Sequence, residues 1–332
     1  MKLPERLRRW EAFSHFATDQ LECLEGNVSL EHLAPGEVIV REGDTTRDAY
    51  LIESGKVRIK RKTPYGDYTL AILGPGDLFG ETAFVDEHAR SGDAVTEDEA
   101  HLVGFNPDSL AAAFETDRRI ALAFYWTFWK SLSRKLRDTN WRLEEFFSRT
   151  GGSDDSAHNR GDGQAADFRV DLSSKRKLFE EQRLSRMEIN FLTTLSQERR
   201  LAPGELLFRE GDEGQEMYVV LEGRVMIYKF IPGAGEEALA FLERGDYFGE
   251  MALIDREPRS AWARADDGGA VVLAIPEEVL SGILDITKVS SLPLLKILCS
   301  LVAKRLRELD DKLIGWHILS GGGADTLPPT KK

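Results

Sequence analysis

An arginine follows a glutamate by nine positions at two places in the chain, each time within the same local string. Gly-Asp-x-Phe-Gly-Glu precedes the arginine and a serine follows it, over residues 76–91 and again over residues 245–260. A guanidinium and a serine hydroxyl both donate hydrogen bonds that suit the oxygens of a phosphate. A carboxylate is repelled by phosphate but accepts from a hydroxyl, so each glutamate suits a ribose 2′-hydroxyl. The string therefore has the chemistry to hold a phosphate and its ribose.

The backbone of the same string offers further donors. A short helix that starts near the glutamate would present unpaired N–H groups, and its dipole favours an anion. The glycine before the glutamate allows the backbone to approach a ligand closely. The predicted ligand-binding residues of this string are Gly80, Glu81, Thr82, Ala83, Arg90 and Ser91 in the first copy, and Gly249, Glu250, Met251, Ala252, Arg259, Ser260 and Ala261 in the second.

A longer repeat surrounds the two strings. Residues 33–44 read LAPGEVIVREGD and residues 201–212 read LAPGELLFREGD, so the repeated unit, at an offset of 168 to 169 residues, is a whole domain. An alternative interpretation is that each string only turns a strand and that each Arg–Glu pair is a solvated ion pair. Both copies keep Gly, Glu, Ala, Arg and Ser together while neighbouring positions differ, which favours a binding site.

The elements that must position these residues follow from the hydrophobic pattern. Short apolar runs separated by Gly, Pro and Asp turns cover residues 33–115 and 201–275, which predicts the strands of a sandwich or small barrel. Helical periodicity precedes the strands and follows them to about residues 148 and 314. Residues 150–170 are rich in Gly, Ser and Asp, which predicts a flexible linker. The predicted domains are residues 1–149 and 171–316, with a disordered tail over residues 317–332.

Composition excludes several classes of protein. The net charge of −13 and the pI near 5.1 argue against a nucleic-acid partner. The longest apolar stretch, residues 292–303, is too short to span a bilayer, and the N-terminus has no signal-peptide pattern. Two cysteines indicate no disulfide framework, so we expect a cytoplasmic protein. The six histidines show no paired spacing, and we predict neither a metal site nor a catalytic residue nor a cofactor.

Both halves resemble cyclic nucleotide-binding domains, the family of bacterial cAMP receptor proteins, regulatory subunits of cAMP-dependent protein kinase and cyclic-nucleotide-gated channels. The resemblance implies two tandem eight-stranded jelly-roll barrels with flanking helices, each followed by a long C-terminal helix. We call each Gly-Asp-x-Phe-Gly-Glu string, together with its Arg-Ser pair, a cassette. Gly92 stands where the family usually has Ala, a departure that we expect to loosen the first cassette. The matching strings begin at Pro35, Arg41, Ser54, Phe79 and Arg90 in the first half, and at Pro203, Arg209, Glu222, Phe248 and Arg259 in the second.

The last helix of each half carries two further predictions. Apolar residues alternate at three and four positions, which is typical of a heptad seam and predicts a partner helix. The partner would be the other copy within one chain, a pseudo-dimer, or the same helix in a homodimer. The resemblance places base recognition at Thr139 and Asn140 for the first site, and at Leu309 and Asp310 for the second. A hydroxyl and an amide can satisfy the edge of adenine, so the first site is predicted to take cAMP.

The resulting functional prediction is a sensor that is not an enzyme. It would bind a cyclic mononucleotide, with cAMP favoured over cGMP, and signal by conformational change to an unidentified protein partner. The alternatives are an inhibitor that resembles kinase regulatory subunits and a receptor for cGMP or another cyclic mono- or dinucleotide. A metal enzyme of the cupin type is the remaining alternative, and it would need converging His and carboxylate ligands.

Overall fold

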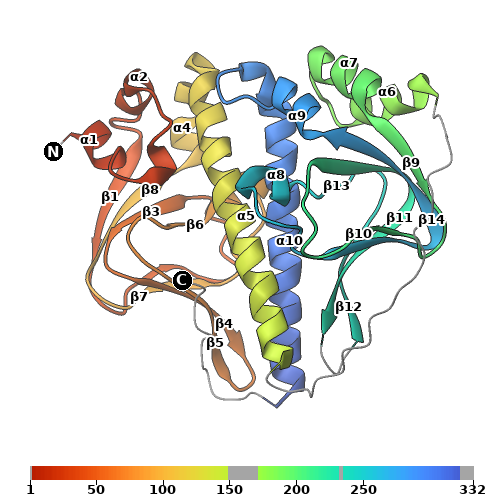
Figure 1. Cartoon of the computed structure of the whole chain (residues 1–332). Helices are drawn as coiled ribbons and strands as arrows, with labels where there is room; N and C mark the ends of the chain where they lie inside the picture. The colour runs from red at the N-terminus through yellow and green to blue at the C-terminus, as the bar shows by residue number, and fades with distance from the viewer. Residues whose placement is uncertain (1, 149–170, 232–234, 322–332) are drawn as a thin grey trace. The chain divides into compact units, whose positions relative to one another are not determined.

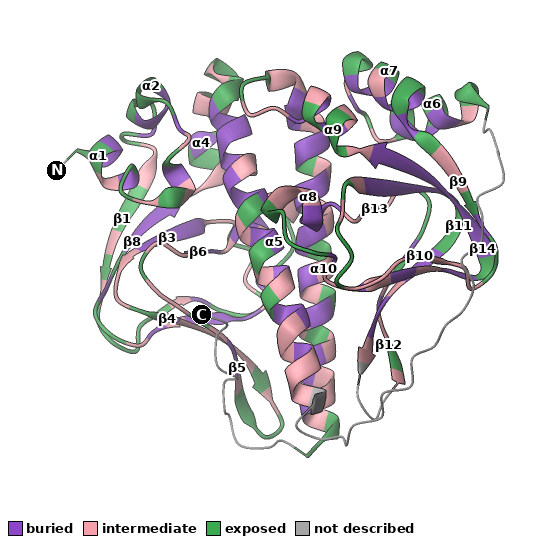
Figure 2. Ribbon diagram, viewed as in Figure 1, coloured by how far each residue is buried: buried purple, intermediate pink, exposed green. Residues whose placement is uncertain are grey.

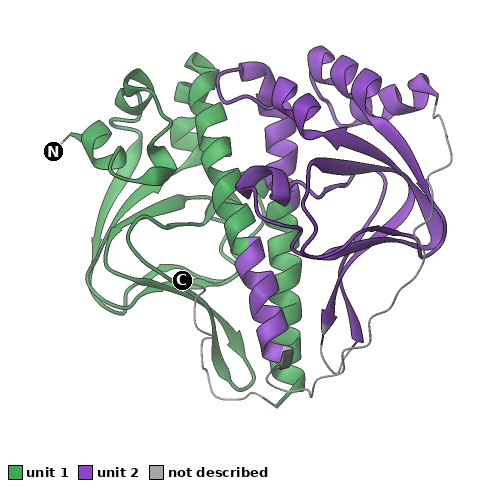
Figure 3. Ribbon diagram, in the orientation of Figure 1, with its two compact units in different colours: residues 1–135, 302–332 green, residues 136–301 purple. Residues whose placement is uncertain are grey.

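The computed structural model describes residues 2–148, 171–231 and 235–321. It divides into two compact units, of which the first holds residues 1–135 and 302–332 and the second holds residues 136–301 (Figure 3). Each long C-terminal helix therefore contributes to both units, which differs from the predicted domain boundaries. The predicted linker, residues 150–170, lies wholly outside the described residues.

The eight strands of the first unit form two four-stranded antiparallel sheets, ordered β1-β8-β3-β6 and β2-β7-β4-β5 (Figure 1). This pairing arises when one long antiparallel ladder is folded in two, and it defines a jelly roll. The mainly β fold with flanking helices is confirmed, with two sheets in place of a single closed barrel. The strands are β1 (Val28–Leu33), β2 (Val38–Val40), β3 (Ala49–Ser54), β4 (Val57–Thr63), β5 (Gly66–Leu73), β6 (Leu78–Phe79), β7 (Asp93–Thr96) and β8 (Ala100–Phe105).

The core of the first unit lies between its two sheets. Tyr50 and Ile52 alternate along β3 and meet Val57 of β4 and Ala94 of β7 in one buried cluster. Because side chains two positions apart lie on the same face of a strand, these residues bury the inner face of each sheet. Figure 2 shows β3 and β8 buried over most of their lengths.

The second unit repeats this plan with two pairs of strands fused. Its strands form one six-stranded sheet in which β10, β14, β11 and β12 follow one another, while β13 pairs with β11 and β9 with β14. The long β11 and β14 take the places of β3 with β4 and of β7 with β8. The strands are β9 (Gln197–Leu201), β10 (Leu206–Phe208), β11 (Glu216–Ile231), β12 (Gly235–Leu242), β13 (Tyr247–Phe248) and β14 (Trp262–Pro276).

One repeated glycine sets the bend between the two halves of each fold. Gly55 has φ +82° between β3 and β4, and a Cβ there would lie 2.4 Å from the carbonyl oxygen of Glu99. Gly223 has φ +74° within β11, and its Cβ would lie 2.2 Å from the oxygen of Gly269. Only glycine fits a left-handed conformation in such close backbone contact.

Helices flank the strands of both units, and two of them are long. The helix α5 (Arg118–Ser148) and the helix α10 (Leu292–Leu319) span 31 and 28 residues. Because α10 runs to Leu319, the predicted start of the tail at residue 317 is too early, and residues 322–332 lie outside the described part. The others are α1 (Leu3–Leu7), η1 (Glu11–Phe13), α2 (Thr18–Glu22), α3 (Glu81–Asp86), α4 (Pro107–Thr116), α6 (Leu172–Glu181), α7 (Arg186–Leu195), α8 (Met251–Asp255), α9 (Glu277–Ile283) and η2 (Val289–Ser291).

An aromatic cluster fixes the first part of α5 within its unit. The ring of Phe124 meets those of Phe13 and Phe105 at centroid distances of 6.2 and 5.3 Å. Phe84 of α3 packs edge-on against Phe128 at 4.9 Å. These contacts anchor α3 on α5, so the short helix that begins at Glu81 has a rigid support. None of the helices in the described ranges is long and apolar enough to cross a membrane.

Candidate functional site: two phosphate cassettes

The first cassette begins with a turn that only glycine can make. Gly80 has φ +83° and caps α3, and a Cβ on it would lie 2.4 Å from the oxygen of Asp48 and 2.7 Å from Arg90 Nη1. The structure therefore places Glu81, Thr82 and Ala83 in the first turn of a helix, as predicted from the string. Their backbone N–H groups lie at the end of a helix that favours negative charge.

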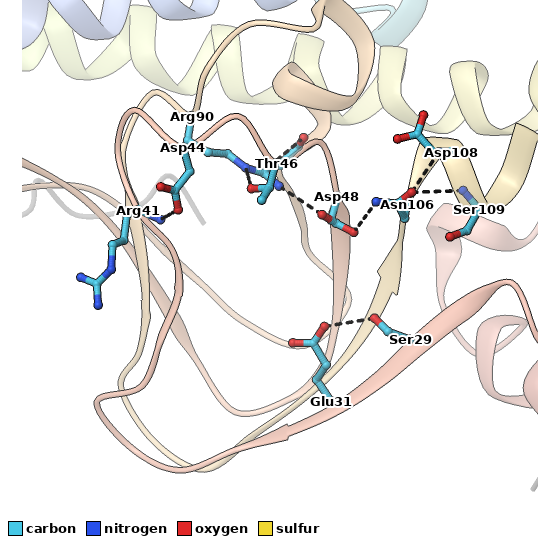
Figure 4. Close-up of polar contacts among 11 residues, drawn as sticks. Ser29, Glu31, Arg41, Asp44, Thr46, Asp48, Arg90, Asn106, Asp108 and Ser109 are labelled. Atoms are coloured by element: carbon cyan, nitrogen blue, oxygen red, sulfur yellow. Dashed lines mark hydrogen bonds and ion pairs between the residues drawn. The ribbon is translucent and has the colours of Figure 1, made fainter.

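Arg90 lies buried in this cassette with one donor unused. Its side chain is 3% exposed, Nε donates to Thr46 Oγ1 at 3.1 Å, and Nη1 donates to the oxygen of Gly80 at 3.4 Å. Nη2 lies 4.0 Å from Asp48 Oδ2 and has no hydrogen-bond partner among the described residues. Figure 4 shows the guanidinium between Thr46 and Asp48. A buried cationic donor without a partner is costly, and an anion would satisfy it.

The charge environment of Arg90 supports the same conclusion. Burial lowers the pKa of Arg90, although the Tyr50 hydroxyl and the carboxylates of Asp48 and Asp44 act in the opposite direction. Asp48 is oriented in turn by Asn106 Nδ2, which donates to Asp48 Oδ1 at 3.0 Å (Figure 4). The guanidinium is thus desolvated and only loosely neutralised by protein groups, which suits recognition of an anion.

The repeated Arg-Glu-Gly-Asp string positions this arginine, a role that the sequence did not reveal. Asp44 Oδ2 accepts from the backbone N–H of Arg41 at 3.0 Å and closes a turn. Across this turn, Gly43 donates to the oxygen of Arg90 at 3.0 Å, and Arg90 donates to the oxygen of Asp44 at 2.8 Å. The same pair of backbone bonds joins Gly211 and Asp212 to Arg259, each at 2.9 Å. The two repeated strings therefore form one structural unit in each half.

Glu81, the predicted ribose ligand, is oriented by α5. Lys135 Nζ lies 2.8 Å from Glu81 Oε1 and 2.7 Å from Oε2, and Ser131 Oγ donates to Oε1 at 2.5 Å. Lys135 also donates to the oxygen of Leu78 at 2.8 Å. A carboxylate offers about four lone-pair sites, so a site remains for a hydroxyl. Lys135 and Ser131 were missed because they lie 54 and 50 residues from Glu81, without any local signal.

The second cassette has the same outline with a differently bonded arginine. Gly249 has φ +75°, Glu250 caps α8, and Met251 and Ala252 form its first turn. Arg259 Nη1 donates to the oxygen of Gly249 at 2.6 Å, and Nη2 donates to the oxygen of Glu216 at 2.7 Å. Its guanidinium stacks 4.4 Å above the ring of Phe208, and its buried Nε has no hydrogen-bond partner among the described residues. Burial also lowers the pKa of Arg259.

The remaining predicted cassette residues lie beside the arginines. Ser91 is half-buried, Ser260 Oγ lies 3.8 Å from the sulfur of Met251, and Ala261 is buried. A Cβ on Gly92 would lie 2.8 Å from the oxygen of Lys60, so this position has no room for the usual alanine without a shift. The structure thus gives a steric reason for Gly92, and the loosened cassette stays a prediction.

The residues predicted to read the base belong to different units from those expected. Thr139 and Asn140 are buried and belong to the second compact unit, which also holds Arg259. Leu309 and Asp310 belong to the first, which also holds Arg90. Membership of a unit does not show a ligand contact, so the assignment of Thr139 and Asn140 to a particular site stays a prediction. The difference in units arises because α5 changes unit after Lys135, so its later turns make their contacts in the second unit. The predicted pairing of the two long helices stays a prediction.

Each unit joins a jelly-roll type of strand arrangement to a buried arginine beside the start of a short helix, a combination that suits an anion. The family is shown directly by sequence. The model of the cyclic nucleotide-binding domain matches residues 30–117 and 198–286, which together exceed half of the chain. The chain belongs to the cyclic nucleotide-binding domain family and carries two such domains in tandem.

Individual relatives share one or both domains. A Cyclic AMP receptor protein of Thermus thermophilus is 38% identical over 118 residues, which cover 35% of this chain and 52% of that protein. A cAMP-dependent protein kinase regulatory subunit of Blastocladiella emersonii is 24% identical over 254 residues, which cover 76% of this chain and 52% of that protein. The chain thus spans about half the length of these relatives.

Among solved structures, the regulatory domain of Toxoplasma gondii PKA in complex with cAMP is 21% identical, with a TM-score of 0.31. The match covers 84% of this chain and 90% of that chain. Within the described residues, no three His, Cys, Asp or Glu side chains gather into a cluster that could hold a metal ion.

Proposed function

We propose that the chain is a cyclic nucleotide sensor that binds cAMP in both cassettes and signals by conformational change to a protein partner. The observation that carries the proposal is the buried guanidinium of Arg90, whose Nη2 has no hydrogen-bond partner in the described structure. It lies beside the N-terminal turn of α3 and the oriented carboxylate of Glu81. An anionic phosphate with a neighbouring ribose hydroxyl complements all three groups.

For the base, the second cassette is the one that we propose to read adenine through Thr139 and Asn140. Asn140 Oδ1 is buried and has no hydrogen-bond partner among the described residues, so it can accept from an exocyclic amine. Leu309 offers no such bond in the first unit, and we expect less discrimination between cAMP and cGMP there. The proposal assigns no catalytic step to the chain.

The test is isothermal calorimetry with cAMP and with cGMP on the full chain and on arginine variants. Arg90→Ala and Arg259→Ala should each abolish or weaken one binding event, by about 2–5 kcal/mol, since a buried charged ligand loses its partner. Exposed arginines of each unit serve as matched controls, in the variants Arg119→Ala and Arg176→Ala. Unchanged binding by the Arg90→Ala/Arg259→Ala double variant would show that the assigned cassettes are wrong.

A protein kinase catalytic subunit is the partner class that we propose first. The similarity to the Blastocladiella emersonii regulatory subunit extends over 254 residues and therefore over both domains, whereas the Thermus thermophilus relative matches 118 residues. The direct test adds the purified chain to a purified cAMP-dependent kinase catalytic subunit and measures kinase activity with and without cAMP. Inhibition that cAMP relieves supports this partner class, and unchanged activity at saturating chain excludes it for the subunit tested.

A further inference from the structure

A single arginine of α10 holds the far end of the first cassette. Arg307 Nε and Nη2 each donate to an oxygen of Asp86 at 3.0 Å, and Nη1 donates to the oxygen of Ala89 at 2.8 Å. Asp86 is the last residue of α3, and its side chain is 8% exposed. The fork of an arginine fits this bidentate geometry, which a lysine cannot reproduce.

The contact at Ala89 fixes the peptide group that carries Arg90. The carbonyl of Ala89 and the N–H of Arg90 belong to one peptide plane. Its N–H donates to the oxygen of Asp44 at 2.8 Å, and its carbonyl accepts from Arg307. The backbone of the phosphate-binding arginine is therefore held from both sides, by the Arg-Glu-Gly-Asp turn and by α10.

The second cassette repeats this arrangement with an arginine of α5. Arg137 Nε and Nη2 donate to the two oxygens of Asp255 at 2.8 and 3.0 Å, and Nη1 donates to the oxygen of Pro258 at 2.9 Å. Asp255 ends α8, and Pro258 directly precedes Arg259. We call each of these arginines, with its three bonds, an arginine fork. Both cassettes keep these three bonds although many of their side chains differ, so the fork is a specific feature rather than a chance surface contact.

A second pair of ionic contacts ties the same helical segments to the strands. In the first unit, Arg61 of β4 binds both Glu42 and Asp311 of α10. In the second, Lys229 of β11 lies 2.6 Å from Glu210 and 2.8 Å from Glu144 of α5. Each segment is thus fixed to the cassette end and to the Arg-Glu-Gly-Asp turn of the unit that contains it.

Each long helix begins in one unit and ends in the other. The helix α10 begins in the second unit and belongs to the first unit from Val302, so Arg307 lies on a helix that starts in the other unit (Figure 3). Likewise α5 begins in the first unit and belongs to the second from Leu136, just before Arg137. Each fork therefore joins a cassette to a helix that is covalently continuous with the unit of the other cassette.

We propose that Arg307 and Arg137 are positioning residues that couple nucleotide binding at each cassette to the helix carrying the fork, and thereby to the other cassette. This inference rests on the proposed nucleotide binding. Phosphate bound by Arg90 and the first turn of α3 stiffens the loop between Glu81 and Arg90. The fork, at the end of that loop, passes the restraint to α10. By linkage, a helix held in place also strengthens binding at the cassette.

The test uses the full chain with the second cassette disabled by Arg259→Ala. In this background, Arg307→Gln should weaken cAMP binding at the first cassette by about tenfold, since charge-assisted bonds to the cassette are lost. Hydrogen–deuterium exchange supplies the specific readout. Saturating cAMP should protect the backbone amides of residues 302–312 in the Arg259→Ala chain, and this protection should be absent when Arg307→Gln is added.

Two further variants keep the test decisive. Arg307→Lys retains the charge but not the fork and should lose the protection as Arg307→Gln does, while circular dichroism reports that both chains are folded. Lys304→Gln removes an exposed charge of the same helix and should behave as the Arg259→Ala chain. Protection that persists at saturating cAMP in both Arg307 variants would overturn the inference. Failure of the Arg259→Ala chain to bind cAMP would instead count against the proposed function.

Discussion

At the scale of single residues, two arginines in equivalent places offer different atoms to a ligand. Arg90 Nε is satisfied by Thr46 Oγ1, which leaves Nη2 as the unused donor. Gly214 stands at the place of Thr46 in the second unit, and a Cβ there would lie 2.8 Å from Arg259 Cζ. The side chain of Arg259 occupies that space and leaves Nε unused. Because the free donors differ, we expect the two cassettes to bind a ligand with unequal affinities.

His15 should give the stability of the first unit a pH dependence. Its Nε2 lies 3.1 Å from the oxygen of Ala123, and burial lowers its pKa, with Lys130 acting in the same direction. The unfolded chain therefore binds more protons than the folded one below the ordinary pKa of about 6.5. The stabilisation is complete above that pH and is lost as the pH falls toward the folded pKa. Urea titrations at about pH 7.5 and pH 5 should show this loss.

The His15→Gln variant keeps an amide donor but cannot titrate. Its unfolding free energy should fall less between the two pH values than that of the parent chain. His88, whose side chain is 74% exposed, provides the control, and His88→Gln should keep the parent's pH dependence. Equal pH dependence in the parent and in His15→Gln would contradict this role of His15.

At the scale of elements, the repeated Gly-Asp-x-Phe-Gly-Glu string carries the proposed ligand contacts. The repeated Arg-Glu-Gly-Asp string forms the turn that holds the arginine. The sequence was sufficient to predict the strand regions and the short helix after Gly80, because each depends on local spacing. The phosphate-binding role of Arg90 and Arg259 stays a prediction. The support of Glu81 by Lys135 could not be predicted, because the two residues meet only through packing of α3 on α5. The division of each long helix between the two units could not be predicted either, since the apolar spacing of α5 is continuous on both sides of Lys135.

The two glycine bends, at Gly55 between β3 and β4 and at Gly223 within β11, should be the least tolerant positions of the β framework. Gly55→Ala should lower the unfolding free energy by about 3 kcal/mol, because it adds overpacking against the oxygen of Glu99 to a strained positive φ. Gly223→Ala should act similarly in the second unit, against the oxygen of Gly269. The measurement is urea denaturation followed by circular dichroism.

Gly74→Ala is the matched control for these two variants. Gly74 has no neighbouring atom within 4 Å of an added Cβ and lies outside the left-handed region. Its replacement should leave the unfolding free energy within about 0.5 kcal/mol of the parent. A similar loss of stability in all three variants would contradict the steric explanation of the bends.

At the scale of the whole molecule, the duplication provides two cassettes whose supporting helices run from one unit into the other. The cassette ends are bonded by Arg307 of residues 302–321 in the first unit and by Arg137 of residues 136–148 in the second. Binding at the two sites is therefore expected to be linked, with the arginine forks as the physical connection. A regulatory role toward a partner would use the same ligand-dependent restraint of the helices.

The central claim is that both cassettes bind a cyclic nucleotide, and equilibrium dialysis with labelled cAMP measures this most directly. Two cAMP molecules should bind per parent chain at saturation, and one should bind to Arg90→Ala and to Arg259→Ala at the same concentration. A parent chain that binds no cAMP, or single variants that both still bind two with unchanged affinity, would contradict it.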